Sequence, residues 1–97
     1  MYTINDIINT TSFQGLQVGK LMDLNAKEIL QINLEAASIF PKHTSPRDAI
    51  LLMLEGEISF FINHAEYKIL KHQVFNFPKD EEHWVEAKKN SRFLIIR

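Results

Sequence analysis

Two histidines, His43 and His83, stand in segments that could hold them in a binding site. Pro41 and Pro46 flank the first histidine and disfavour helix, so this segment is expected to be extended or turned. Side chains at positions i and i+2 of a strand point to the same face, which would place Ser45 beside His43. Imidazole together with carboxylate suits divalent Zn, Fe, Mn, Ni and Cu, so the two histidines are candidates for two of the ligands of such a metal.

The same two histidines have a second interpretation that needs no metal. They could line a cavity as neutral, hydrogen-bonded side chains, or bind a small organic anion. Ligand pockets are mostly apolar with a few polar anchors. Bulky side chains that alternate along the predicted strands are therefore candidates both for the core and for a pocket wall. The core candidates are Leu51, Met53, Phe60, Ile62, Phe75 and Phe77. Of these we expect Met53, Phe60 and Phe75 also to contact a ligand, together with His43, Ser45 and His83.

The other histidines and acidic residues fit ordinary surface roles. His64 falls in a predicted hairpin turn, and His72 in a turn before the next strand. The acidic run 80–82 is typical of a solvated loop. Trp84 follows His83 directly, so strand alternation should point it away from the cavity, into a second layer or a dimer contact.

The hydrophobic pattern of the chain favours β-strands. Leu30, Ile32 and Leu34 alternate with polar residues, which is typical of a strand with one buried face. Thr3 is predicted to cap one short N-terminal helix that carries Ile4, Ile7 and Ile8. Further strands are predicted over residues 18–24, 49–54, 58–62, 67–70, 74–77, 83–87 and 92–96, with a hairpin turn at 63–66.

One of these strands, residues 49–54, is apolar on both faces, which predicts cover on both sides. In a small barrel the core covers the inner face, and a second copy of the chain is the simplest cover for the outer face. Phe61 points away from Phe60 and Ile62 and supports the same expectation of a homodimer.

Composition limits the class of protein. The chain has 97 residues, 45% of them hydrophobic and 24% charged, which fits one globular domain. Its net charge of −1 argues against nucleic acid as a partner. No apolar run approaches the ~20 residues that span a bilayer, so no membrane partner is expected. The N-terminus has no signal-peptide pattern and cysteine is absent, so we expect a cytoplasmic protein.

Two segments of the chain, residues 41–57 and 72–87, resemble the two motifs of the cupin superfamily. In the first, the family pattern of two histidines, a glutamate and a glycine falls on His43, Ser45, Ala49 and Gly56. In the second, the proline and the histidine fall on Pro78 and His83. The resemblance therefore implies a metal-ligand set in which two of the four usual positions are replaced. Asp48 adjoins Ala49, but alternation puts it on the opposite face.

The resemblance implies an all-β jelly roll, also called a double-stranded β-helix barrel, with residues 1–97 as a single cupin domain. We expect a stand-alone protein that binds a small organic molecule in the barrel, with or without a weakly held divalent metal. A metal-dependent dioxygenase, isomerase or decarboxylase is one alternative. The other is a metal-free enzyme with a histidine as general base, which would need a carboxylate partner and usually a tyrosine acid. The available tyrosines, Tyr2 and Tyr67, lie outside the motifs.

Overall fold

Nine strands and one four-residue helix make up the chain, and the computed structural model describes residues 1–97. The all-β fold with one short N-terminal helix, expected from the sequence, is confirmed. The elements are α1 (Ile7–Thr10), β1 (Leu16–Leu24), β2 (Lys27–Leu34), β3 (Ile39–His43), β4 (Ala49–Glu55), β5 (Glu57–Ile62), β6 (Ala65–Leu70), β7 (Val74–Phe77), β8 (His83–Ala87) and β9 (Ser91–Ile96).

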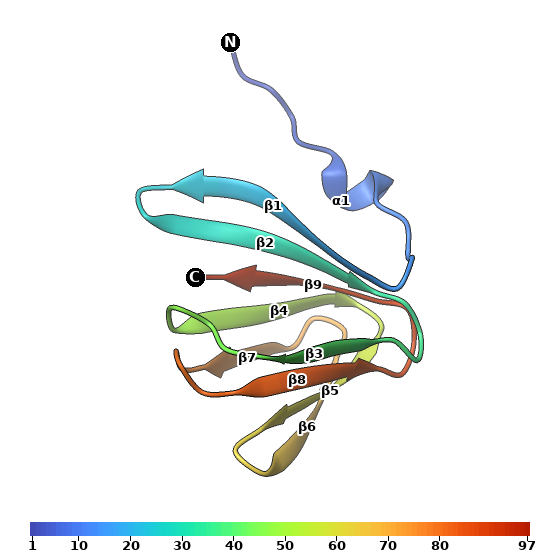
Figure 1. Cartoon of the computed structure of the whole chain (residues 1–97). Coiled ribbons are helices and arrows are strands. Elements are labelled where there is room, and N and C mark those ends of the chain that lie inside the picture. The colour runs from blue at the N-terminus through green and yellow to red at the C-terminus, as the bar shows by residue number, and fades with distance from the viewer.

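The strands form two antiparallel sheets that face each other (Figure 1). The five-stranded sheet has the order β1-β2-β9-β4-β7, and the four-stranded sheet has the order β3-β8-β5-β6. Apart from the hairpins β1–β2 and β5–β6, successive strands alternate between the sheets. This is the jelly-roll arrangement, and it brings strands that are distant in sequence side by side.

The core lies between the two sheets and contains 14 buried apolar residues. It follows from period-2 alternation: Ala49, Leu51 and Met53 of β4 are buried, whereas Ile50 between them is exposed. Phe60, Ile62 and Phe77 are also buried, as expected from the sequence, and Phe75 packs against this cluster half-buried.

The last strand, β9, lies inside the five-stranded sheet. It pairs with β2 on one side and with β4 on the other. Every second side chain of β9 is buried, including Phe93 and Ile95. The strand therefore has no exposed edge on which another chain could add.

The turn between β4 and β5 requires a glycine. Gly56 has a φ of +91°, and a Cβ at this position would lie 2.5 Å from the Asn90 carbonyl oxygen and would also meet Ser91. The hydroxyl of Ser91 accepts a hydrogen bond from the Glu57 amide at 3.1 Å, so this close approach holds the turn in place. The predicted hairpin is also present, but its turn is shorter than the expected 63–66: only Asn63 and His64, both at positive φ, form it, and β6 begins at Ala65.

The N-terminal helix is shorter than predicted and begins later. Asp6, and not Thr3, occupies the N-cap position, and α1 has only four residues. The Asn5 side chain takes the capping role, because its Oδ1 accepts a hydrogen bond from the Ile7 amide at 3.0 Å. Ile4 therefore lies outside the helix and is almost fully exposed. No helix in the structure is long and apolar enough to cross a membrane.

Candidate functional site

His43 and His83 meet because β3 pairs with β8. The two residues are direct partners in this antiparallel ladder, so both side chains point between the sheets. Their Nε2 atoms lie 3.0 Å apart, and the two rings meet edge to face with centroids 4.2 Å apart. His83 is buried and His43 is half-buried. The structure thus joins the two histidines that were selected from the sequence.

Backbone carbonyl groups fix the orientation of both rings. The Nδ1 atom of His43 lies 2.7 Å from the Pro41 oxygen, and that of His83 lies 2.9 Å from the Glu81 oxygen. A carbonyl oxygen only accepts, so each Nδ1 is the protonated nitrogen and each Nε2 presents a lone pair. Burial, and then the neighbouring His43, lower the pKa of His83 below the ordinary histidine value.

A cavity of about 230 Å³ opens beside the histidine pair, between the two sheets. Of the residues predicted to contact a ligand, His43, His83, Ser45 and Phe60 line it. Arg97 lines it as well. The remaining wall is mostly apolar and consists of Val18, Leu30, Ile32, Phe40, Thr44, Pro46, Phe77, Val85, Phe93 and Ile95.

Met53 and Phe75, which we expected at the site, do not line this cavity. Met53 is completely buried in β4 as part of the core. Phe75 contacts other aromatic rings, with centroid distances of 4.9 Å to Phe60 and 5.1 Å to Tyr67. Both side chains point inward as alternation required, but core side chains fill the space around them, so they act in packing.

Arg97 is the site residue that sequence reasoning missed. Its Nη1 donates to the Ser45 hydroxyl at 3.4 Å, and its Nε donates to the Glu28 carboxylate at 2.7 Å. Phe93 and Ile95 point inward from β9, and Arg97 directly after the strand continues their period of two, which was the available signal. Glu28 also contacts Lys20 at 3.3 Å, and these two cations lower the pKa of Glu28.

The donor set beside the cavity does not fit a resident transition metal. No group of three or more His, Cys, Asp or Glu side chains in the structure is arranged to hold a metal ion. Protein sites that retain zinc use at least three protein ligands, whereas only two imidazoles converge here. Asp48 lies on the far face, as predicted, where its carboxylate accepts from the Lys79 amide at 2.9 Å. Ala49, at the position of the family glutamate, offers no donor.

The partners of an acid–base histidine are also missing beside the pair. Both Nδ1 atoms contact backbone carbonyls and not carboxylates. Neither Tyr2 nor Tyr67 lines the cavity. The polar groups at the wall of the apolar cavity are therefore two Nε2 atoms that face each other, one hydroxyl and one guanidinium.

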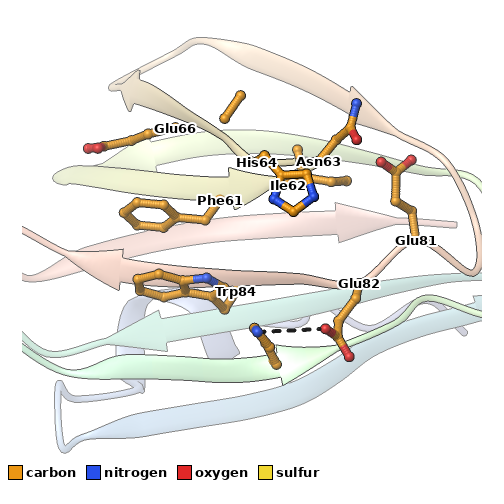
Figure 2. A pocket seen from close by; sticks show the side chains of 10 residues that line it. Phe61, Ile62, Asn63, His64, Glu66, Glu81, Glu82 and Trp84 are labelled. Atoms are coloured by element: carbon orange, nitrogen blue, oxygen red, sulfur yellow. Dashed lines mark ion pairs between the residues drawn. The ribbon is translucent and has the colours of Figure 1, made fainter.

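A second, wider hollow lies on the outer face of the four-stranded sheet (Figure 2). There Phe61 and Trp84 stack with ring centroids 3.8 Å apart. Lys42 and Glu82 form an exposed ion pair at 3.8 Å along one side. Trp84 thus points away from the cavity, as alternation predicted. This hollow is shallow and does not include the histidine pair, so we place the candidate site in the smaller internal cavity.

Sequence comparison and structural comparison give different results for this chain. The sequence matches no protein-family model and no curated protein. An RmlC-like cupin from Desulfovibrio desulfuricans superposes with a TM-score of 0.84 at 17% identity, covering 99% of this chain and 95% of that one. A cupin-2 domain protein from Shewanella frigidimarina has a TM-score of 0.81 at 20% identity, covering 97% and 92% of the two chains.

A conserved protein of unknown function from Streptococcus pyogenes is similar over the same length. Its TM-score is 0.83 at 18% identity, and the match covers 99% of this chain and 86% of that one. Identities this low establish the architecture and not the activity. Together with the two facing sheets and the paired motif strands β3 and β8, these matches show that this small chain has the cupin fold.

Proposed function

We propose that this cupin barrel is a binding module for a small organic anion, held in the internal cavity without a resident metal. The observation that carries the proposal is the pair of facing Nε2 atoms of His43 and His83, 3.0 Å apart at the cavity wall. The volume of about 230 Å³ is below that of pockets for drug-sized ligands, so the ligand has few non-hydrogen atoms.

The two histidine rings make more hydrogen-bond contacts than they have N–H hydrogens when neutral. Three contacts involve their ring nitrogens: His43 Nδ1 to a carbonyl, His83 Nδ1 to a carbonyl, and Nε2 to Nε2. Each contact needs one hydrogen, but two neutral imidazoles carry only two. Uptake of one proton would satisfy all three contacts. Burial opposes this charge and lowers the pKa of His83. An anion in the cavity would compensate for the buried charge, so the pair favours anionic ligands.

Arg97 supplies a second anchor for the same ligand class. A guanidinium has five N–H donors. The contacts to Glu28 and Ser45 use the Nε donor and one donor on Nη1, which leaves donors for a ligand oxygen. A carboxylate fits this combination, because charge-assisted hydrogen bonds from arginine and protonated histidine to carboxylate are among the stronger ones in proteins. The apolar wall suits the hydrocarbon part of the molecule.

Thermal unfolding of the full chain in the presence of small carboxylates, compared with uncharged amides of the same size, tests the proposal. We expect carboxylates to raise Tm and the amides to have little effect, since a ligand that binds only the folded state stabilises it by mass action. The shift should be larger at pH ~6 than at pH ~8, because the proposed binding includes uptake of one proton by the histidine pair, and protons are more available at the lower pH.

Matched variants locate the binding site. We expect His43→Gln and Arg97→Gln each to reduce carboxylate affinity about tenfold or more, corresponding to the loss of one charge-assisted hydrogen bond. His64→Gln and Arg47→Gln replace exposed residues of the same types and should leave affinity unchanged.

Equal stabilisation by amides and carboxylates would contradict the proposal. A second outcome would also contradict it: stoichiometric metal in protein purified without chelator. If a His43→Ala, His83→Ala variant lost this metal, the two histidines would belong to a metal site.

A further inference from the structure

We propose that the internal cavity selects short aliphatic monocarboxylates over dicarboxylates, and that Glu28 sets this selectivity by neutralising Arg97. The selectivity presupposes the function proposed above, because it concerns the ligand of the same cavity. Glu28 does not line the cavity, so it is a positioning residue that acts through its contact with the Arg97 guanidinium.

Two cross-strand pairs, one from each sheet, form a polar end of the cavity. His43 and His83 are partners between β3 and β8. Glu28 of β2 faces Arg97, directly after β9, and their backbones exchange two hydrogen bonds of 2.7 and 3.1 Å. The ends of β3 and β9 and the starts of β2 and β8 lie at the same end of the barrel (Figure 1). Ser45 connects the two pairs, because it follows His43 by two residues and accepts from Arg97 Nη1 at 3.4 Å.

The next inward-facing pairs along the same strands are apolar. Leu30 is paired with Ile95 between β2 and β9, and Phe40 is paired with Val85 between β3 and β8. All of these side chains line the cavity. A ligand therefore meets charge and hydrogen-bond donors at one end and mainly hydrocarbon beyond it. This arrangement matches an anionic head group with an aliphatic tail.

The cavity volume limits the ligand to a few carbons. The volume is about 230 Å³, which is roughly seven to eight times the ~30 Å³ that a water molecule occupies in the liquid. A methylene group occupies a similar volume, so a ligand of about seven non-hydrogen atoms fills the cavity. Pentanoate is a molecule of this size. A longer chain would have to displace core side chains, which a close-packed interior resists.

The charges at the polar end compensate one negative charge and not two. The Glu28 carboxylate accepts from Arg97 Nε at 2.7 Å, and the two side chains are only 20% and 21% exposed. This mostly buried ion pair has no net charge. Lys20 also contacts Glu28, at 3.3 Å, but it is half exposed and has Asp23 as a second acidic partner at 3.5 Å. Uptake of one proton by the histidine pair therefore leaves a single positive charge, which one carboxylate neutralises.

A dicarboxylate of the same length would place its second charge in the apolar part of the cavity. There Ile32 and Phe93, paired between β2 and β9, offer no hydrogen-bond donor from their side chains. A buried carboxylate without a partner is strongly disfavoured. The Arg97 charge does not offset it, because Glu28 already neutralises Arg97. Without the Glu28 charge, the cavity would be more positive, and a dianion would gain more from this than a monoanion.

Calorimetric titration of the full chain with pentanoate and with glutarate, whose carbon chains are equally long, tests the proposal. We expect pentanoate to bind at least about tenfold more tightly than glutarate. Glu28→Gln should reduce this ratio severalfold, because glutarate gains more than pentanoate from the freed guanidinium. Asp23→Asn is the matched control. It removes the other acidic partner of Lys20 without a contact to Arg97, so the ratio should stay that of the parent chain.

The binding function and its selectivity fail in different ways. Binding of neither acid would overturn both. Equal affinities for the two acids in the parent chain would overturn the selectivity and leave anion binding in place, and this comparison needs no variant. A ratio that Glu28→Gln leaves unchanged, or that Asp23→Asn reduces equally, would overturn the role of Glu28. Both variants should keep the β-sheet content seen by circular dichroism, since Glu28 retains its backbone bonds to Arg97.

Discussion

At the scale of single residues, three contacts hold the histidine pair: one local contact of each ring with a nearby backbone carbonyl, and one contact between the two rings. Each ring is oriented by a carbonyl two residues earlier in the chain, Pro41 for His43 and Glu81 for His83. The contact between the two Nε2 atoms spans 40 residues. Local contacts thus choose the tautomer, and strand pairing brings the two lone pairs together.

Burial of His83 predicts a stability that decreases as pH falls. Its pKa is lowered in the folded state, so the unfolded chain binds more protons between the ordinary value of about 6.5 and the folded value. Stability is therefore complete above pH ~6.5 and is lost as pH falls through this window. Urea unfolding at a series of pH values would measure the slope.

His83→Gln is the control for this pH dependence. The variant removes the titrating group, so its unfolding free energy should change less between pH ~7 and pH ~5.5 than that of the parent chain. The carboxylate of Glu28 has a lowered pKa and titrates only at more acid pH, which keeps the two effects apart. An unchanged slope in the variant would assign the pH dependence to other groups.

At the scale of elements, the β4–β5 turn depends on a glycine. Gly56→Ala would force a Cβ to within 2.6 Å of the Ser91 Cα and would place alanine at a φ of +91°. We expect a loss of roughly 2–4 kcal/mol in unfolding free energy, from backbone strain and overpacking together. Urea unfolding at one fixed protein concentration would measure it.

Gly19→Ala is the matched control within a strand. A Cβ at Gly19 would meet nothing within 4 Å, and its φ is not positive. The change should stay within about 0.5 kcal/mol, as for most surface substitutions. If both alanine variants lost stability equally, the close approach of Gly56 to β9 would not be what the turn requires.

At the scale of the whole molecule, the cupin fold leaves two outer sheet faces of different character. One bears the stacked Phe61 and Trp84 among charged side chains, and the other bears the exposed apolar residues Ile50 of β4 and Val74 of β7. A net charge of −1 provides little repulsion between copies. The homodimer predicted from the sequence would therefore meet little electrostatic opposition.

Thermal unfolding of a dimer depends on protein concentration. If the folded chain associates and the unfolded chain does not, Tm should rise with concentration by mass action. Ile50 is exposed on the outer face of the doubly apolar strand β4, where the sequence predicts a second copy, so Ile50→Lys should weaken the dependence of Tm on concentration. Leu70→Lys changes a similarly exposed leucine on the other sheet and should behave like the parent chain. A constant Tm for the parent chain over a wide concentration range would contradict the dimer.

Alternation of apolar and polar residues was enough to predict nearly every strand and the buried side of each. This works because the side-chain period of a strand is local and does not depend on which strands become neighbours. His43 and His83 were identifiable for the same reason, from the prolines, turns and apolar segments around them. The β-structure, the main core positions and the two histidines were thus determined by the sequence alone.

Only the tertiary structure decided which inward side chains share a site. Met53 points inward but is packed in the core, whereas Arg97 points inward and reaches the cavity. The difference depends on where the two sheets leave space between them, and no local pattern encodes that distance. Likewise, β3 and β8 are far apart in the sequence, and they pair only when the other strands of both sheets are in place. The packing of the two sheets therefore decides which side chains reach the cavity, and so which chemical groups the site contains.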